Sequence, residues 1–223
     1  GPQDLLLCHG GQSGINLVLD CCLRGDRPVV LIEDLAYPGF RYAARAARAE
    51  VVTVELDSEG IRPDALEAAC RRYGPQVLCL TPAAQNPTAA RMSAARQADI
   101  IAIARKFDLQ IIEDECYSVA ISDLSTLRAL APERVWYTGS LSKSVSAALR
   151  FGYVACPLGM GDNARLAAQH NFFALSLPLA ELVLDLLQSG AAAEIRGKVQ
   201  LEFDARLHML VRQLRGFDLT WQA

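Results

Sequence analysis

Short apolar segments of four to six residues recur along the chain, and most are separated by segments with helical periodicity. Their apolar residues are nearly continuous rather than alternating, which is typical of strands buried on both faces. They cover residues 5–8, 28–32, 51–56, 77–80, 109–112, 134–138 and 151–156. Strands that alternate with helices predict an α/β fold with a mainly parallel sheet and helices on both faces.

The C-terminal part of the sequence differs from this pattern. Residues 191–214 predict one long amphipathic helix, with apolar side chains mostly on one side. Residues 217–221 would then begin a strand that the sequence does not complete. We therefore expect one large domain at residues 1–190, followed at residues 191–223 by an interdomain helix and the start of a truncated small domain.

Composition excludes several classes of protein. Hydrophobic residues make up 52% of the chain, charged residues 21%, and the net charge of -3 includes no basic block, so nothing calls for contact with nucleic acid. No apolar run approaches the roughly 20 residues that cross a bilayer, and we expect a cytoplasmic protein. The seven cysteines are odd in number and scattered, as reduced core thiols are, and the three histidines have no zinc-ligand spacing. We expect no metal site.

Two turns at the ends of predicted strands could bind a ligand. Gly11 and Gln12 lie between a strand and a helix, where backbone N–H groups and the helix dipole suit a phosphate; a tight turn would also explain them. Tyr37 precedes a Pro-Gly turn at the carboxyl end of a strand, where α/β proteins bind ligands. Its ring could face an aromatic cofactor or pack against the following helix.

Two further strand ends carry polar side chains. Asn86 lies in a stiff loop between Pro82 and Pro87 that could hold its amide in place. Asp114 lies in a run of three acids after a buried strand. That run could be a solvated strand end, or its carboxylates could face a metal or a protonated nitrogen.

The segment from Tyr137 to Lys143 presents a single lysine on a turn of glycine and serine, and Arg150 follows on the next segment. We interpret Lys143 as a lysine that forms a Schiff base. Ser140, Ser142 and Arg150 would then hold a phosphate.

Together these motifs resemble the pyridoxal-phosphate enzymes of fold type I, in particular the class I/II aminotransferases, over nearly the whole chain. The matching motifs are Gly10-Gly11-Gln12, Tyr37-Pro38-Gly39, Asn86-Pro87-Thr88, Asp114 with Tyr117, Ser140-Leu141-Ser142-Lys143, and Arg150. The segments at residues 36–40 and 81–88 look most like the aminotransferase-like domains of MocR-type regulators in the GntR superfamily. Those proteins carry a winged helix-turn-helix ahead of this domain.

The resemblance implies a role for each of these residues. Lys143 would form the internal aldimine with pyridoxal 5'-phosphate and act as the base at the substrate Cα. Asp114 would face the pyridine nitrogen, and a protonated ring is the electron sink of the reaction. Asn86 and Tyr117 would hydrogen-bond the phenolic oxygen of the cofactor, while Tyr37 would stack on its ring. The phosphate would contact Gly11, Gln12, Ser140, Ser142 and Arg150.

The sequence also departs from the family pattern. Ala89 stands where the family usually has glycine, which would shift the loop or narrow the space over the cofactor. The region before the phosphate turn and most of the small C-terminal domain, with its arginine for the substrate carboxylate, are expected to be missing.

Three functions remain open. The first is transfer of an amino group between an amino acid and a 2-oxo acid, by a homodimer. The second is an effector domain of a MocR/GntR-type regulator that binds the cofactor and an amine with little or no turnover, DNA binding being left to a missing N-terminal domain. The third is a lyase, racemase or decarboxylase with the same cofactor.

Overall fold

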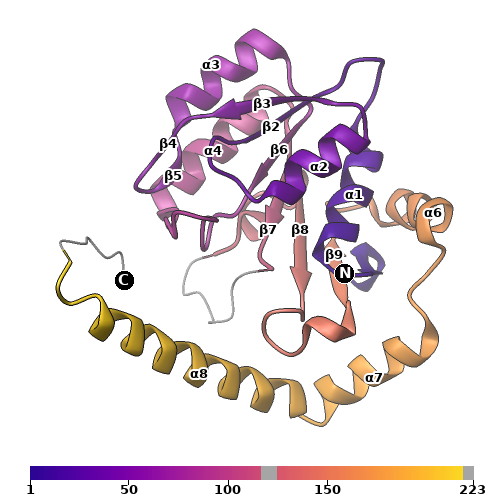
Figure 1. Cartoon of the computed structure of the whole chain (residues 1–223). Coiled ribbons are helices and arrows are strands. Elements are labelled where there is room, and N and C mark those ends of the chain that lie inside the picture. Colours follow the sequence, from indigo (N-terminus) through magenta and orange to yellow (C-terminus); the bar gives the residue numbers. More distant parts are fainter. Residues whose placement is uncertain (117–124, 218–223) are drawn as a thin grey trace.

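The computed structural model describes residues 1–116 and 125–217 (Figure 1). In this part of the chain the main sheet has seven strands in the order β1-β9-β8-β7-β6-β2-β3. The strands are β1 (Leu5–Cys8), β2 (Val29–Glu33), β3 (Glu50–Val54), β6 (Val77–Leu80), β7 (Gln110–Asp114), β8 (Val135–Ser140) and β9 (Gly152–Ala155). A separate two-stranded hairpin consists of β4 (Leu56–Asp57) and β5 (Gly60–Ile61).

The sheet is mainly parallel, as the sequence predicts. Strands β8, β7, β6, β2 and β3 pair in parallel. Within the described residues, β9 runs against both of its neighbours, β8 and β1. The connection from β8 to β9 is therefore a hairpin rather than a crossover, and it carries the segment with Lys143.

Helices cover both faces of the sheet (Figure 1). They are α1 (Gly11–Cys22), α2 (Pro38–Ala46), α3 (Pro63–Tyr73), α4 (Ala94–Lys106), α5 (Leu127–Leu130), α6 (Gly161–Phe172), α7 (Leu177–Gln188) and α8 (Ala191–Gln213), with the 3-10 turns η1 (Pro2–Asp4) and η2 (Ala147–Leu149). Proline begins α2 and α3, where its missing N–H costs nothing. Ser93 caps α4 by accepting the Arg96 N–H.

Two hydrophobic cores hold these layers together. One packs α1, α2 and α6 against one face of the sheet and includes the fully buried Trp136, whose indole N–H donates to Gln110 at 3.0 Å. The other packs α3, α4 and α5 against the opposite face. Side chains of β2 point alternately into the two cores, with Val30 and Ile32 in the first and Leu31 in the second. The continuous apolar strands seen in the sequence thus serve two cores at once.

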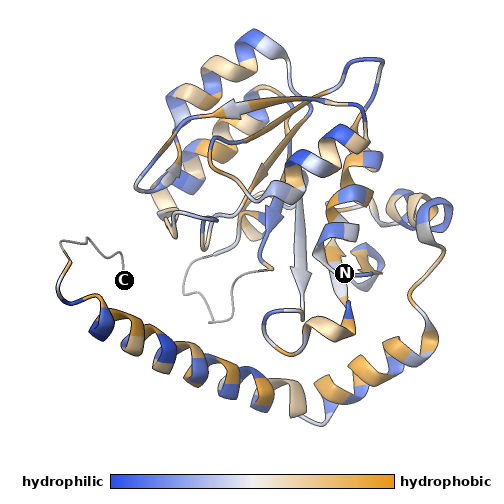
Figure 2. Cartoon of the chain, viewed as in Figure 1, coloured by the Kyte–Doolittle hydropathy of each residue, from blue (hydrophilic) through white to orange (hydrophobic). Residues whose placement is uncertain are grey.

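Helices α7 and α8 lie away from the sheet (Figure 1), and both carry hydrophobic stretches (Figure 2). Large apolar side chains of α8 are exposed, among them Leu201 at 70% and Leu207 at 53%. The long helix confirms the prediction for residues 191–214, whereas the domain boundary at residue 190 stays a prediction. The strand expected at residues 217–221 lies largely outside the described residues.

Candidate functional site

A cavity of about 190 Å³ lies where the N-terminus of α1 meets the carboxyl ends of β7 and β8. Eight of the ten predicted site residues line it. The residues around the cavity are Gly11, Gln12, Tyr37, Asp114, Cys116, Ser140, Ser142, Lys143 and Arg150. The parallel strands bring these segments to one edge of the sheet, as expected for an α/β protein.

The first wall of the cavity is the turn that begins α1. Gly10 precedes the helix with a φ of 85°, a conformation that residues with a side chain rarely adopt. The guanidinium of Arg150 lies so close that a Cβ on Gly10 would be 3.1 Å from its Nη2. A Cβ on Gly152, at the start of β9, would come within 2.6 Å of the Gly10 backbone. These two glycines let the hairpin bring Arg150 beside the N-terminus of the helix.

The second wall is the turn between β8 and β9. The hydroxyl oxygens of Ser140 and Ser142 are 2.9 Å apart, and Ser140 Oγ also accepts the Ser142 N–H at 3.1 Å. Ser140 Oγ lies 3.0 Å from the Phe151 carbonyl oxygen, on the other side of the hairpin. These contacts fix both hydroxyls at the cavity. Lys143 and Arg150 are exposed residues of the same turn.

The third wall is the acidic end of β7. Asp114 is only 3% exposed, and its Oδ1 accepts the Cys116 N–H at 2.9 Å. Burial raises the pKa of this carboxyl. Glu113 is 1% exposed and accepts the N–H groups of Leu127 and Arg128, both at 2.8 Å, while burial raises its pKa to about 7. A solvated strand end is therefore the wrong interpretation of both Glu113 and Asp114.

Tyr37 packs against the following helix, as one of its two predicted roles requires, and its role toward a cofactor stays a prediction. Its ring meets Phe40 of α2 edge-on, with the centroids 5.8 Å apart, and it also lines the cavity. The pKa of the phenol is raised, first by burial and then by the negative charge of Asp114. Gln12 fixes the turn that carries Tyr37, because its side-chain amide donates to the Gly39 carbonyl at 3.0 Å.

Of the two remaining predicted residues, one does not line this cavity and the other cannot be placed. Asn86 is half-buried in the loop at residues 81–90 and does not appear among the residues around the cavity. Tyr117 lies outside the described residues. Cys116, in contrast, lines the cavity although sequence reasoning took it for a core thiol. Burial and the neighbouring Asp114 raise the pKa of its thiol, so it is neutral. Its position two residues after Asp114 was the signal that could have indicated it.

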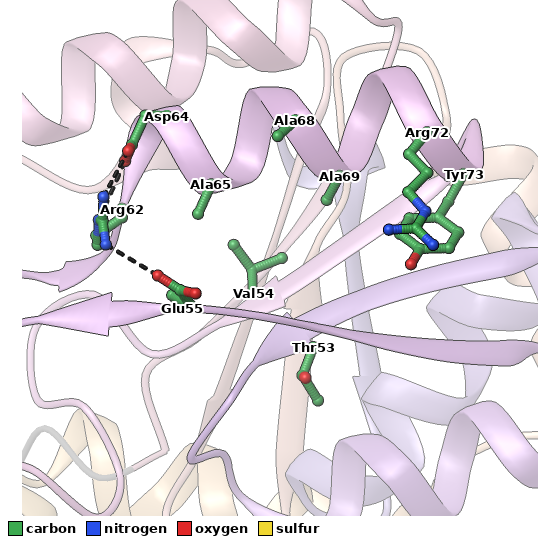
Figure 3. Close-up of a pocket in the computed structure, with 10 residues that line it drawn as sticks. All are labelled: Thr53, Val54, Glu55, Arg62, Asp64, Ala65, Ala68, Ala69, Arg72 and Tyr73. Atoms are coloured by element: carbon green, nitrogen blue, oxygen red, sulfur yellow. Dashed lines mark hydrogen bonds and ion pairs between the residues drawn. The ribbon is translucent and has the colours of Figure 1, made fainter.

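A larger hollow of about 350 Å³ lies between β3 and α3, far from these groups in the sheet order (Figure 3). Three alanines of α3 line one side and Val54 of β3 the other (Figure 3), while Arg62 donates to Glu55 at 2.9 Å and to Asp64. Arg72 lies over the Tyr73 ring at 5.0 Å. The hollow does not combine a cation with a buried carboxylate as the first cavity does.

The described residues include no group of histidine, cysteine or acidic side chains that could hold a metal ion. Within the same part of the chain, no helix is long and apolar enough to cross a membrane.

Residues 1–220 match the family model described as aminotransferase class I and II. The chain belongs to this family. Among curated relatives, an uncharacterized HTH-type transcriptional regulator, YdeF of Bacillus subtilis (strain 168), is 32% identical over 180 residues, which are 80% of this chain and 38% of that protein. The aromatic amino acid aminotransferase C1773.13 of Schizosaccharomyces pombe is 34% identical over 185 residues, 68% of this chain and 37% of that enzyme.

Solved structures give the same result for the fold. LysN, an α-aminoadipate aminotransferase from Thermus thermophilus in complex with N-(5'-phosphopyridoxyl)-L-leucine, superposes with a TM-score of 0.85 at 26% identity. The match covers 98% of this chain and 57% of that one. The predicted fold class, a fold type I large domain, is confirmed. The chain spans about two fifths of the length of the two curated relatives, 38% and 37%.

Proposed function

We propose that this chain binds pyridoxal 5'-phosphate through Lys143 and that the protein transfers an amino group between an amino acid and a 2-oxo acid. One observation carries the proposal: Lys143, Arg150, two serine hydroxyls and the buried Asp114 line a single cavity. Membership of the aminotransferase family and the phosphopyridoxyl ligand of LysN support it.

The phosphate group fits the first two walls. The N–H groups of Gly11 and Gln12 are at the start of a helix of 12 residues, where the helix dipole favours an anion. Ser140, Ser142 and the guanidinium of Arg150 are beside them. Hydroxyl donors and a forked cation are the groups that proteins use to hold phosphate oxygens.

The ring nitrogen fits Asp114. Burial raises the pKa of this carboxyl, so its ionised form is costly unless a positive charge comes close to it. A protonated pyridine nitrogen would supply that charge, and Asp114 would in turn keep the nitrogen protonated. Pyridoxal phosphate, when bound, supplies an electron sink for the bonds at the substrate Cα. Tyr37 would cover one face of the ring.

Lys143 would have two tasks. Its amine would hold the cofactor when no substrate is bound, and it would take and return the proton at the substrate Cα. Asn86 and Tyr117 would donate to, or accept from, the phenolic oxygen of the cofactor. Cys116 would contribute a neutral, weakly polar surface to the same cavity.

An assay of product tests the reaction. We expect the full-length protein, loaded with pyridoxal phosphate and given a mixture of amino acids and one 2-oxo acid, to release a new oxo acid. Lys143→Ala should abolish this, whereas Lys198→Ala, in an exposed ion pair on α8, should not. Carbon dioxide or racemised substrate in place of the oxo acid would show a decarboxylase or a racemase, and free ammonia released together with the oxo acid would show a lyase.

The second candidate is a regulator that binds the cofactor with little or no turnover. It is supported by the 32% identity to an HTH-type regulator over 80% of this chain. Cofactor binding without oxo acid production, together with an encoded winged helix-turn-helix upstream of residue 1, would favour it. The DNA contacts would then come from that segment, and an amino acid or amine would be the effector.

We further propose that the protein is a homodimer and works in the cytoplasm. The exposed apolar side chains of α7 and α8, such as Leu187 at 54%, support a covered surface in the assembled protein. The seven free cysteines support a reducing compartment. Sedimentation of the loaded protein should give a dimer; a stable monomer that still carries the cofactor on Lys143 would contradict this.

A further inference from the structure

Asn86 needs an explanation, because its amide is expected at the cofactor while the residue is not among those that line the cavity. Its backbone N–H donates to Thr81 Oγ1 at 3.2 Å. Thr81 is at the end of β6 and is fully buried. The position of the Asn86 side chain therefore depends on how the loop at residues 81–90 is fastened to the sheet.

Gln85 is the centre of this loop. Its backbone N–H donates to the Ala90 carbonyl at 3.0 Å, and its carbonyl accepts the Ala89 N–H at 2.7 Å. Its side-chain Oε1 accepts both the N–H of Thr88 at 2.9 Å and the hydroxyl of Thr88 at 2.6 Å. A backbone N–H can only donate, so these contacts fix which atom of the Gln85 amide is oxygen.

The orientation of the amide directs its nitrogen toward β2. Gln85 Nε2 donates to the Leu35 carbonyl at 2.6 Å, and its second hydrogen is shared between the Asn86 carbonyl at 3.1 Å and Oε2 of Glu33 at 3.2 Å. The hydroxyl of Thr81 also approaches the same carboxylate oxygen, at 3.4 Å. Thr81 and Gln85, which precede Asn86 in the loop, therefore both contact the carboxyl group of Glu33.

Glu33 is unusual among glutamates because its side chain is buried, whereas most glutamate side chains are exposed to solvent. It is 1% exposed, and its Oε1 has no hydrogen-bond partner among the described residues. Gly60 of the β4–β5 hairpin packs over that oxygen, since a Cβ at this glycine would be 3.7 Å away. Cys79 on the neighbouring strand β6 is a titratable group whose thiol pKa is raised, above all by burial and only to a lesser extent by the charge of Glu33. A buried polar atom without a partner is costly, which argues for a role beyond packing.

We propose that Glu33 is a positioning residue for Asn86: its carboxyl orients the Gln85 amide, and the amide sets the loop that presents Asn86 to the phenolic oxygen of the cofactor. This inference rests on the proposed function. Glu33 touches neither cofactor nor substrate in this account and acts only through Gln85. Hydrogen bonds connect the three residues in series: Gln85 Nε2 donates to the Glu33 carboxylate, and the Thr88 hydroxyl donates to Gln85 Oε1.

Two variants of Glu33 test this series of hydrogen bonds. Glu33→Met has a similar volume but no acceptor, so it leaves the Gln85 amide without one of its partners, whereas Glu33→Gln keeps an acceptor oxygen. Glu50→Met, at an exposed glutamate on the neighbouring strand β3, is the matched control. The first measurement is amide hydrogen exchange across residues 81–92 in the protein without cofactor. We expect exchange about tenfold faster in Glu33→Met, as for a lost buried hydrogen bond, and near the unmodified rate in the other two.

The second measurement uses the protein loaded with pyridoxal phosphate and follows its visible absorbance against pH. An amide that donates to the phenolic oxygen stabilises the ionised form of the chromophore and lowers the midpoint. We expect Asn86→Ala to raise the midpoint, and Glu33→Met to raise it in the same direction. In a double variant with Asn86→Ala, Glu33→Met should not shift the midpoint any further, because both changes remove the same contact between Asn86 and the phenolic oxygen.

The outcomes separate the two claims. Unchanged exchange in Glu33→Met, or faster exchange with an unchanged midpoint, would overturn the positioning role while the unmodified protein still binds its cofactor. An additive shift in the double variant would overturn it as well. If the unmodified protein develops no visible band at saturating cofactor, the proposed function fails, and the positioning role fails with it.

Discussion

The stability of this protein should fall as pH rises through neutrality, and Glu33 should account for a defined part of the loss. Burial raises the pKa of Glu33 from 4.5 to about 7 in the folded protein, against smaller opposing effects of Gln85 and Thr81. The folded state then binds a proton that the unfolded state releases. The stabilisation is complete below pH 4.5, declines as pH rises, and is lost above pH 7.

The expected size follows from that difference in pKa. At about 1.4 kcal/mol for each pH unit, the folded protein loses about 3 kcal/mol of stability from Glu33 between pH 4.5 and 8. Glu33→Gln has no proton to lose and keeps an acceptor for Gln85. Its free energy of unfolding should therefore fall by about 3 kcal/mol less than that of the unmodified protein over the same range.

Urea unfolding at intervals from pH 5 to 8 measures this difference. Glu113 and Glu115 also have raised pKa values, about 7 and about 8, so both proteins should lose stability with rising pH. The difference between the two curves isolates Glu33. Glu50→Gln, at an exposed position, should follow the unmodified protein. Parallel curves for Glu33→Gln and the unmodified protein would refute the reasoning.

Three further substitutions test other parts of the account. Gly10→Ala should weaken binding of pyridoxal phosphate by more than tenfold in a spectral titration. Gly10 has a φ of 85°, which alanine rarely adopts, and a Cβ there would press on the Arg150 guanidinium. Unchanged affinity would show that this turn tolerates a side chain. Ala89→Gly should raise the free energy of unfolding by about 0.5 to 1 kcal/mol, since Ala89 has a φ of 60°. Asp114→Asn should keep cofactor binding but lose exchange of the substrate Cα proton, and unchanged exchange would exclude the role given to Asp114.

The layers of the fold were predictable because their signals are local. Continuous apolar strands that alternate with helices predict a sheet covered on both faces. The order of strands was not predictable, since it depends on distant contacts. Leu5 of β1 pairs with Ala155 of β9, and their register follows from packing that no local pattern records. The exposed face of α8 shows the same limit, because amphipathic spacing does not reveal what covers the apolar side.

The candidate site was predictable where several residue types recur at strand ends, as with Lys143 and Asp114. Burial was the part that the sequence did not reveal. Glu113 looks like a solvated acid, but the N-terminus of α5 folds over it and supplies two N–H donors. Glu33 is covered by the β4–β5 hairpin, a contact between distant segments that no local pattern reveals. The left-handed φ at Ala89 explains why glycine is usual there.

The central claim is that Lys143 holds the cofactor, and reductive trapping tests it most directly. Pyridoxal phosphate is added to the full-length protein, borohydride fixes the cofactor to the amine that carries it, and peptide mapping identifies the lysine. We expect a visible band on addition of the cofactor and a phosphopyridoxyl group on Lys143, with neither in Lys143→Ala. A label on Lys106 or Lys198, both exposed lysines in ion pairs, or a band that survives in Lys143→Ala, would contradict it.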